Sequence, residues 1–162
     1  MKSRSVARKI IVTGIVAALY AALTLGLAPI SYGAVQFRLS EVLTLLAFVN
    51  PMYIGGLTLG CFLANLASPL GVVDVIFGTT ATFLSVYMMS RTRNLFVASL
   101  WPVLFNGVII GIELWALFKL PLVLTMLQVA FGEFVVVSIL GVTVFRYGIL
   151  YNTRLMDLLN QR

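Results

Sequence analysis

The chain has 162 residues, of which 61% are hydrophobic and only 10% are charged. A soluble domain is about 45–50% apolar and about 25% charged, so this composition excludes an ordinary soluble domain and predicts an all-α integral membrane protein. The formal net charge of +6 does not indicate a nucleic-acid partner, because the basic residues cluster at the ends of apolar runs, where membrane orientation explains them.

We predict a six-transmembrane-helix bundle, a single membrane domain over residues 1–162, since a bilayer core takes about 20 mostly apolar residues per helix. The basic start of the chain precedes an apolar run without an evident cleavage site, so we expect a first span there and not a removed signal peptide. Four of the five junctions hold a proline, as helix ends often do: Pro29, Pro51, Pro69 and Pro121. The predicted spans are residues 10–28, 39–49, 54–66, 72–89, 96–118 and 122–145.

Two of these spans, 39–49 and 54–66, are short. Each could be tilted or extend through its flanks, or the two could form a helical hairpin around Asn50 and Pro51. The C-terminal tail, residues 151–162, is long enough for a short interfacial helix.

The distribution of Lys and Arg predicts the orientation. With six spans and the N-terminus inside, only Arg38 and Lys119 fall in outer segments, which is a strong positive-inside bias. Both termini are therefore predicted to be cytoplasmic, in a multi-pass protein of the cell membrane. The nine basic residues of the inner segments are Lys2, Arg4, Arg8, Lys9, Arg91, Arg93, Arg146, Arg154 and Arg162.

Small residues recur at a four-residue step in three of the predicted spans. Such spacing lets a neighbouring helix approach closely. For Gly56 and Gly60 in the third span, and for Gly107 and Gly111 in the fifth, packing within the chain is the favoured interpretation. The first span carries a doubled stripe, for which an external partner and internal packing are equally good interpretations: Ala17, Ala18, Ala21 and Ala22, with Gly14 before them.

Four of the five acidic residues, Glu41, Asp74, Glu113 and Glu133, fall in the outer half of the predicted bundle or near its midplane, each on a different span. An ionised carboxylate inside a bilayer costs a few kcal/mol, so such residues are usually paired or face a cavity. For Glu41 and Asp74, interfacial packing and ligand binding remain equally open. Glu133 lies in "VAFGEFVVV" without a basic neighbour, which favours a cavity.

Amides and one arginine join the acids in the same zone, and Asp74, Gly78 and Thr82 form a polar stripe at a four-residue step. One amide alone more often bonds between helices than to a ligand, but together these groups predict an outward-opening pocket. Carboxylates accept hydrogen bonds, so the ligand should be rich in N–H donors and cationic, and an anion is disfavoured. The candidate substrate-binding residues are Gln36, Arg38, Glu41, Asn65, Asp74, Asn106, Glu113 and Glu133, and the aromatic residues Tyr32, Phe37, Phe77 and Trp115 either stack on the ligand or anchor the membrane interface.

The segment "VQFRLSE", residues 35–41, leaves two roles open for its charged pair. Arg38 and Glu41 are three residues apart and would form an ion pair on a helix, a contact of a few tenths of a kcal/mol. Otherwise Arg38 fixes the geometry of the outer loop and Glu41 belongs to the cationic site.

Four segments, "VQFRLSEVLTLL", "IGGLTLGCFLANL", "VVDVIFGTTATFL" and "FNGVIIGIEL", resemble the QueT family of membrane proteins, and the resemblance covers most of the chain. It implies a substrate-binding S component of an energy-coupling factor (ECF) transporter, a type of ABC transporter. The implied substrates are queuosine precursors, 7-deazapurines such as preQ1 or queuine. The implied partners are a transmembrane scaffold subunit, which would contact Ala17, Ala18, Ala21 and Ala22, and two ATPase subunits.

Two other classes of function stay open at this stage. Buried acids also serve proton relays, so the chain could be an autonomous cation-coupled carrier. It could also be a scaffold subunit without a transport role, in which the acids set helix packing. An enzyme is the least favoured class, because the chain has no histidine, no Ser–Lys pair within a span and no metal-ligand spacing, and neither a metal nor another cofactor is expected. The chain has no GxxxxGK phosphate loop, so we do not expect it to power transport by its own ATP hydrolysis.

Overall fold

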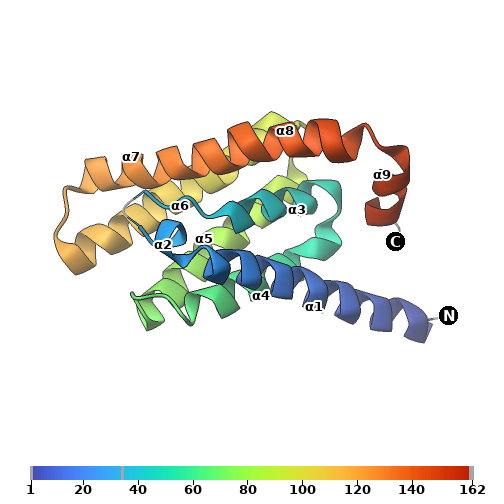
Figure 1. The fold of residues 1–162 in the computed structure, drawn as a ribbon, viewed down its shortest axis with the longest axis horizontal. Helices are drawn as coiled ribbons and strands as arrows, with labels where there is room; N and C mark the ends of the chain where they lie inside the picture. Colours follow the sequence, from blue (N-terminus) through green and yellow to red (C-terminus); the bar gives the residue numbers. More distant parts are fainter. Residues whose placement is uncertain (1, 34, 161–162) are drawn as a thin grey trace.

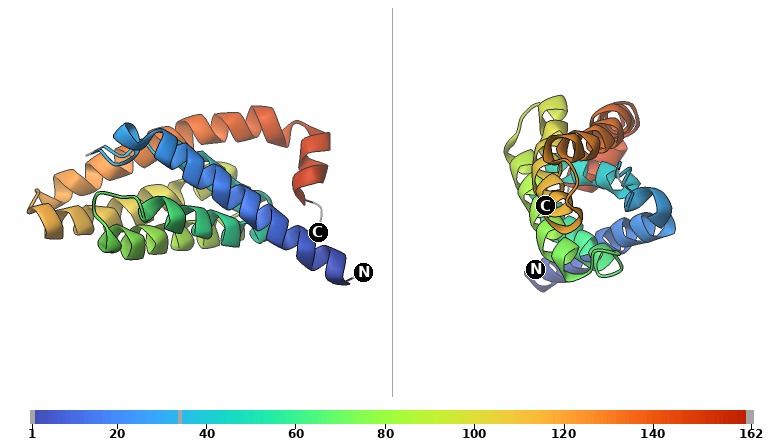
Figure 2. Two further views of the ribbon diagram at one scale, coloured as in Figure 1. Left: turned by 60° about the horizontal axis from the view of Figure 1, so that its bottom comes forward. Right: turned by 90° about the vertical axis from the view of Figure 1, so that its left-hand side faces the viewer.

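The computed structural model describes residues 2–33 and 35–160, and within these ranges it contains helices and no strand. The first helix, α1 (Lys2–Gly26), contains no proline, and it ends before the single turn α2 (Ala28–Ser31), which has Pro29 as its second residue. Helix α1 crosses the other helices at a slant (Figure 2). The predicted all-α class is confirmed.

The second and third predicted spans form short helices. The 3₁₀ helix η1 (Leu39–Leu45) continues into α3 (Leu46–Val49), and the turn η2 (Pro51–Tyr53) leads into α4 (Ile54–Asn65). Asn50 separates the two helices, and its side chain accepts a hydrogen bond from the Met52 N–H at 3.0 Å. Twelve residues of α4 rise only about 18 Å, less than the roughly 30 Å of a bilayer core.

The second half of the chain forms long helices. After α5 (Val72–Arg91), the side chain of Asn94 caps α6 (Leu95–Phe118) by accepting from Phe96 and Val97. The last long helix runs without a break through α7 (Leu122–Glu133), η3 (Phe134–Gly141), α8 (Val142–Val144) and η4 (Phe145–Leu150), with η3 and η4 wound as π-helix.

Four helices of the described chain are long and apolar enough to cross a membrane. Four of the six predicted crossings are therefore supported. The predicted spans 39–49 and 54–66 are shorter than a spanning helix. Asn50 and Pro51 end the first and separate it from the second, which ends at Asn65. The four long helices are Val6–Gly26, Val72–Arg91, Leu95–Phe118 and Leu122–Leu150.

Close helix contacts depend on the predicted small residues. A Cβ atom on Gly60 would lie 2.7 Å from the Tyr20 Cβ and 2.9 Å from the Ala17 carbonyl oxygen, so α4 packs directly on α1. A Cβ on Gly111 would lie 2.8 Å from the Met126 Cα, so α6 packs as closely on α7. Packing within the chain is thus confirmed for the glycines of α4 and α6.

The alanine stripe of α1 divides into two faces. Ala17 is buried in the contact with α4 and Ala21 is half-buried, whereas Ala18 and Ala22 are exposed. Ala17 therefore belongs to the internal packing, because a helix that turns one face to α4 hides the residues on that face. Gly14 has open space beside it, so it continues the exposed face.

The beginning of α1 and the tail helix α9 (Thr153–Asn160) lie at the same end of the molecule (Figure 1). The Tyr53 hydroxyl donates to the Leu159 carbonyl oxygen at 3.0 Å and holds α9 against η2. Burial raises the pKa of Tyr53, and the positive charge of Arg8 acts against that shift. This placement agrees with an even number of crossings, while the side of the membrane on which the termini lie stays a prediction.

Candidate functional site

All eight predicted substrate-binding residues are buried. They come from the loop before η1, from η1 itself and from α4, α5, α6 and α7, so the fold brings distant parts of the sequence into one polar interior. Their hydrogen bonds divide them into two groups. One group is bonded to protein partners, and the other offers acceptors that no described protein atom satisfies.

Arg38 is the centre of the first group. Its Nη2 lies 3.2 Å from Asp74 Oδ2, its Nη1 donates to Asn65 Oδ1 at 3.2 Å, and its Nε donates to the Ser31 carbonyl oxygen at 3.3 Å. The guanidinium also lies over the Tyr32 ring, 5.2 Å from its centre. Arg38 therefore ties the loop to α4 and α5.

The ion pair between Arg38 and Glu41 does not form, and Arg38 pairs with Asp74 instead. The physical reason is that the backbone of Arg38 is extended (φ −78°, ψ 93°) and the helix begins only at Leu39. The i,i+3 neighbourhood applies to residues on one helix, and Arg38 precedes this one.

Tyr32 fixes the same loop from its other side. Its hydroxyl donates to the Ala64 carbonyl oxygen at 2.7 Å. Burial raises the pKa of this hydroxyl, against the influence of the nearby Arg38 charge, so Tyr32 remains a donor at neutral pH. The loop between α2 and η1 is thus bonded to the C-terminal end of α4.

Glu41 is bonded to α1 and α5. The Tyr20 hydroxyl donates to Glu41 Oε1, and the Thr82 hydroxyl lies 3.4 Å from the same oxygen. Thr82 also lies 3.2 Å from the Cys61 sulfur, to which Asn65 Nδ2 donates at 3.4 Å. These contacts link Glu41 to Arg38 in one set, called the bonded network below: Tyr20, Arg38, Glu41, Cys61, Asn65, Asp74 and Thr82.

The predicted stripe of Asp74, Gly78 and Thr82 lies on the inner face of α5, as all three are buried. A Cβ on Gly78 would lie 2.5 Å from Asn65 Nδ2 and 2.7 Å from Asp74 Oδ1. Glycine at this position therefore makes room for Asn65 to reach the Asp74 carbonyl oxygen, to which it donates at 3.0 Å.

The second group consists of Glu113 on α6 and Glu133 on α7, called the open acids below. Asn106 Nδ2 donates to Glu133 Oε1 at 2.7 Å, and Glu133 Oε2 is unsatisfied within the described chain. Both oxygens of Glu113 are buried without a partner there. Two acids of the bonded network add one unsatisfied oxygen each, Glu41 Oε2 and Asp74 Oδ1.

The elements that carry the unsatisfied oxygens pack on one another. Helix η1, which carries Glu41, packs on α6 and on η3, the segment that directly follows Glu133, and α5, which carries Asp74, packs on α6. Buried acceptors without donors carry a desolvation cost that a hydrogen-bonding ligand removes. An arrangement of buried acceptors of this kind could accept hydrogen bonds from a ligand rich in N–H donors.

Gln36 connects this region to a cavity. A Cβ on Gly132 would lie 2.7 Å from the Gln36 carbonyl oxygen, so the loop packs directly on α7 beside Glu133. Gln36 also lines a cavity of about 440 Å³ together with Tyr32, Ser68 and Leu114, the neighbour of Glu113. This cavity lies between the loop, the 66–71 connection and the C-terminal part of α6.

The aromatic candidates divide in the same way. Phe77 and Trp115 are exposed on the outside of their helices, as membrane anchors would be. Phe37 packs against the hydrophobic core, and Tyr32 lines the cavity. Tyr32 also contacts a candidate binding residue, because the Arg38 guanidinium lies over its ring.

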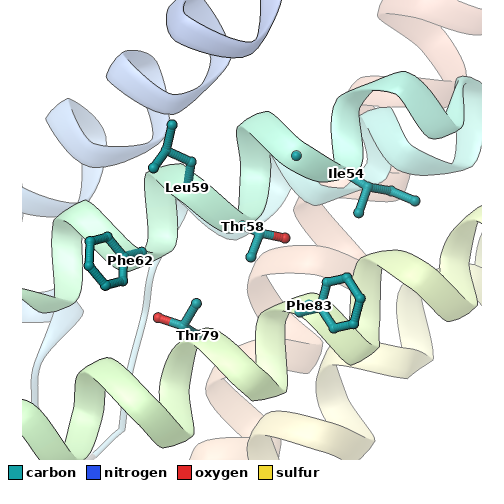
Figure 3. Close-up of a pocket in the computed structure, with 7 residues that line it drawn as sticks. Ile54, Thr58, Leu59, Phe62, Thr79 and Phe83 are labelled. Carbon is teal, nitrogen blue, oxygen red and sulfur yellow. The ribbon is translucent and has the colours of Figure 1, made fainter.

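A second hollow, of about 370 Å³, lies on the outer face between α4 and α5 (Figure 3). Its labelled side chains include Thr58 and Thr79 among Ile54, Phe62 and Phe83. None of the predicted binding residues lines it. Its apolar walls offer no charge to a polar substrate.

The sequence did not predict the parts that Tyr20 and Cys61 play. Both residues sit inside apolar runs, where a tyrosine and a cysteine usually belong to the core. A hint existed for Tyr20, because a buried tyrosine hydroxyl needs a partner and an unpaired acid, Glu41, was available. Thr82 was visible through its stripe with Asp74.

Comparison with known proteins gives the chain a family. Residues 10–148 match the model of the family described as QueT, QueT transporter. A protein of Lactococcus lactis subsp. cremoris (strain MG1363), named Queuosine precursor transporter QueT, is 38% identical over 141 residues, covering 77% of this chain and 83% of the relative. No solved structure matches the chain.

Proposed function

The chain belongs to the QueT transporter family, and from this premise we propose that it captures a queuosine precursor from outside the cell for uptake. The observation that carries the proposal is the set of five buried carboxylate oxygens that lack a partner in the described chain. A 7-deazaguanine that bears an amine, such as preQ1, supplies N–H donors and a positive charge. Both properties match what these acceptors require.

We further propose that the chain is the S component of an ECF transporter. The exposed face of α1 supports this, since Gly14, Ala18, Ala22 and Gly26 all lie on it at a four-residue step. A scaffold helix could approach such a face closely. The chain lacks a GxxxxGK phosphate loop, so two ATPase subunits would supply the energy.

The proposed orientation puts the termini in the cytoplasm and the cavity beside Gln36 on the outer side. The basic residues Arg8, near the start of α1, and Arg154, on the tail helix α9, support it, because both helix ends lie at the end that holds the termini. Lys119 follows α6 at the opposite end. The positive-inside bias then orients the bundle.

Calorimetric titration of the purified protein with preQ1 and queuine tests the substrate. We expect Glu133→Gln to weaken binding by about 1 kcal/mol or more, because a charge-assisted hydrogen bond is lost. Asp157→Asn is the control, since Asp157 is exposed on α9. Absence of heat and of spectral change up to high micromolar preQ1 would contradict the substrate assignment, and unchanged affinity of the Glu133 variant would remove Glu133 from the pocket.

An autonomous cation-coupled carrier is the second candidate. The buried and unpartnered Glu113 favours it, because intramembrane acids often belong to proton relays. Proteoliposomes that contain the chain and no ATPase separate the two functions. Uptake of preQ1 driven by a proton gradient alone supports the carrier, and uptake that requires the ATPases supports the S component.

A further inference from the structure

The two open acids stand in different surroundings. Glu133 shares its site with an amide, since Asn106 Nδ2 donates to Glu133 Oε1 at 2.7 Å. Glu113 has no partner for either oxygen within the described chain, although its side chain is only 3% exposed. An unpartnered carboxylate this deeply buried needs a cation or a donor from outside the chain.

The two acids also lie at different depths in the bundle, since Glu133 on α7 is bonded to Asn106, which precedes Glu113 on α6. Asn106 and Glu113 are seven residues apart, which puts them on the same face of the helix about 10 Å apart along its axis. On α6 the cavity is lined by Leu114 and Phe118, so along the helix axis Glu113 lies nearer to it than Asn106, the partner of Glu133. A ligand that came from the cavity side would therefore meet Glu113 first.

The chemistry of the deep end suits a planar edge. The hydrogen bond from Asn106 fixes the carboxylate of Glu133 and leaves Oε2 as an acceptor beside the amide group. Acceptors that the protein holds side by side can each accept a hydrogen bond from one of two neighbouring N–H donors. The ring N–H and the exocyclic amine of a guanine-like base are such a pair of donors.

The chemistry of the outer end suits an ammonium. Glu113 offers two free oxygens, and the nearby Asp74 charge is balanced by its ion pair with Arg38. A primary ammonium is a compact charge with three donors, and it can satisfy both oxygens of one carboxylate.

We infer that Glu113 determines specificity for the substrate's amine substituent, while Glu133 and Asn106 recognise the edge of the base. This inference rests on the proposed function, since it assigns parts of the same substrate to parts of the same site. It predicts that the protein distinguishes an aminomethyl deazapurine from one in which an uncharged group replaces the amine.

Binding of preQ1 and of its nitrile analogue preQ0 to the purified full chain tests this assignment. The wild type should bind preQ1 at least about tenfold more tightly than preQ0, the worth of one charge-assisted bond. Glu113→Gln should lose roughly tenfold or more for preQ1 and leave preQ0 nearly unchanged, so that the preference collapses. Glu133→Gln, an identical substitution at an equally buried acid, should weaken both compounds and preserve the preference.

Each other result has a defined meaning. A Glu113 variant that retains the preference, or that weakens both compounds equally, overturns the inference. If the Glu113 variant does not fold, binding to the wild type decides. Equal binding of preQ1 and preQ0 overturns the inference. A preference for preQ1 that disappears when its amine is acetylated supports the inference. Failure of the wild type to bind any deazapurine overturns the proposed function, a result distinct from loss of the preference alone.

Discussion

The bonded network and the open acids are both buried and both polar, yet they differ in how completely the protein satisfies them. In the network, Arg38 reaches Asp74 and Asn65, and Tyr20 reaches Glu41. On α6 and α7, Asn106 donates one hydrogen bond to Glu133, and neither oxygen of Glu113 has a partner in the described chain. The difference separates polar groups that hold helices together from buried acceptors that we propose to be ligand contacts.

The origin of the difference lies in the donors. The network draws its donors from α1, from α4 and from the loop before η1, so it joins these elements to α5. The faces of α6 and α7 near Glu113 contribute Leu114, Val129 and Ile110 to an apolar core instead. An acid placed there therefore lacks donors from the described chain.

Substitution of Arg38 gives the largest expected effect, because it removes the charge that balances Asp74. Arg38→Gln should lower the free energy of unfolding by about 3–5 kcal/mol, the cost of leaving one partner of a buried ion pair uncompensated. Thermal unfolding in detergent measures this as a lower melting temperature. The double variant Arg38→Gln and Asp74→Asn should recover part of the loss, because it buries no unpaired charge.

Arg93→Gln is the matched control, since Arg93 is exposed at the start of the connection to α6. It should change the melting temperature little. Equal effects of the two glutamine variants would show that Arg38 is not a centre of the network. Tighter binding of preQ1 to the Arg38→Gln variant would show that Arg38 repels the cationic ligand. Loss of binding would show that Arg38 holds the loop in the geometry that binding requires.

Tyr20→Phe should have a smaller effect of the same sign. The substitution removes the donor to Glu41 Oε1 and keeps the ring that packs in the core. A buried acceptor left without its partner costs about 1–3 kcal/mol, again measured by thermal unfolding. Tyr147→Phe, at an exposed tyrosine, is the control. A neutral Tyr20→Phe variant would place Glu41 with the open acids.

Much of this comparison was visible in the sequence. The motif blocks predicted the family, which is confirmed, and the apolar runs predicted a helical membrane protein. The stripe of Asp74, Gly78 and Thr82 predicted the inner face of α5. These features are local, since each depends on residues within one helix and its period.

The pairing of charges was not visible, because it depends on contacts between distant segments. Arg38 lies closer in sequence to Glu41 than to Asp74, and the extended backbone before η1 directs it to the latter. The short length of the helices in the predicted spans 39–49 and 54–66 likewise depends on Asn50 and Pro51, which end one helix and begin the next. Roles of Glu113 and Glu133 as ligand contacts stay predictions.

Glu113→Gln gives the smallest expected change in stability, and its sign is opposite. Replacing a carboxylate that has no partner by a neutral amide should raise the melting temperature of the ligand-free protein slightly, by up to about 1 kcal/mol in free energy of unfolding, because the desolvation cost falls. With saturating preQ1 the wild type should have the higher melting temperature. A ligand stabilises the folded state more when it binds more tightly, and the wild type is expected to bind preQ1 more tightly than the variant. Melting curves of both proteins with and without preQ1 measure this reversal. If the Glu113 variant without ligand has a lower melting temperature than the wild type, Glu113 makes stabilising contacts as the residues of the bonded network do. The distinction between the two regions would then be wrong.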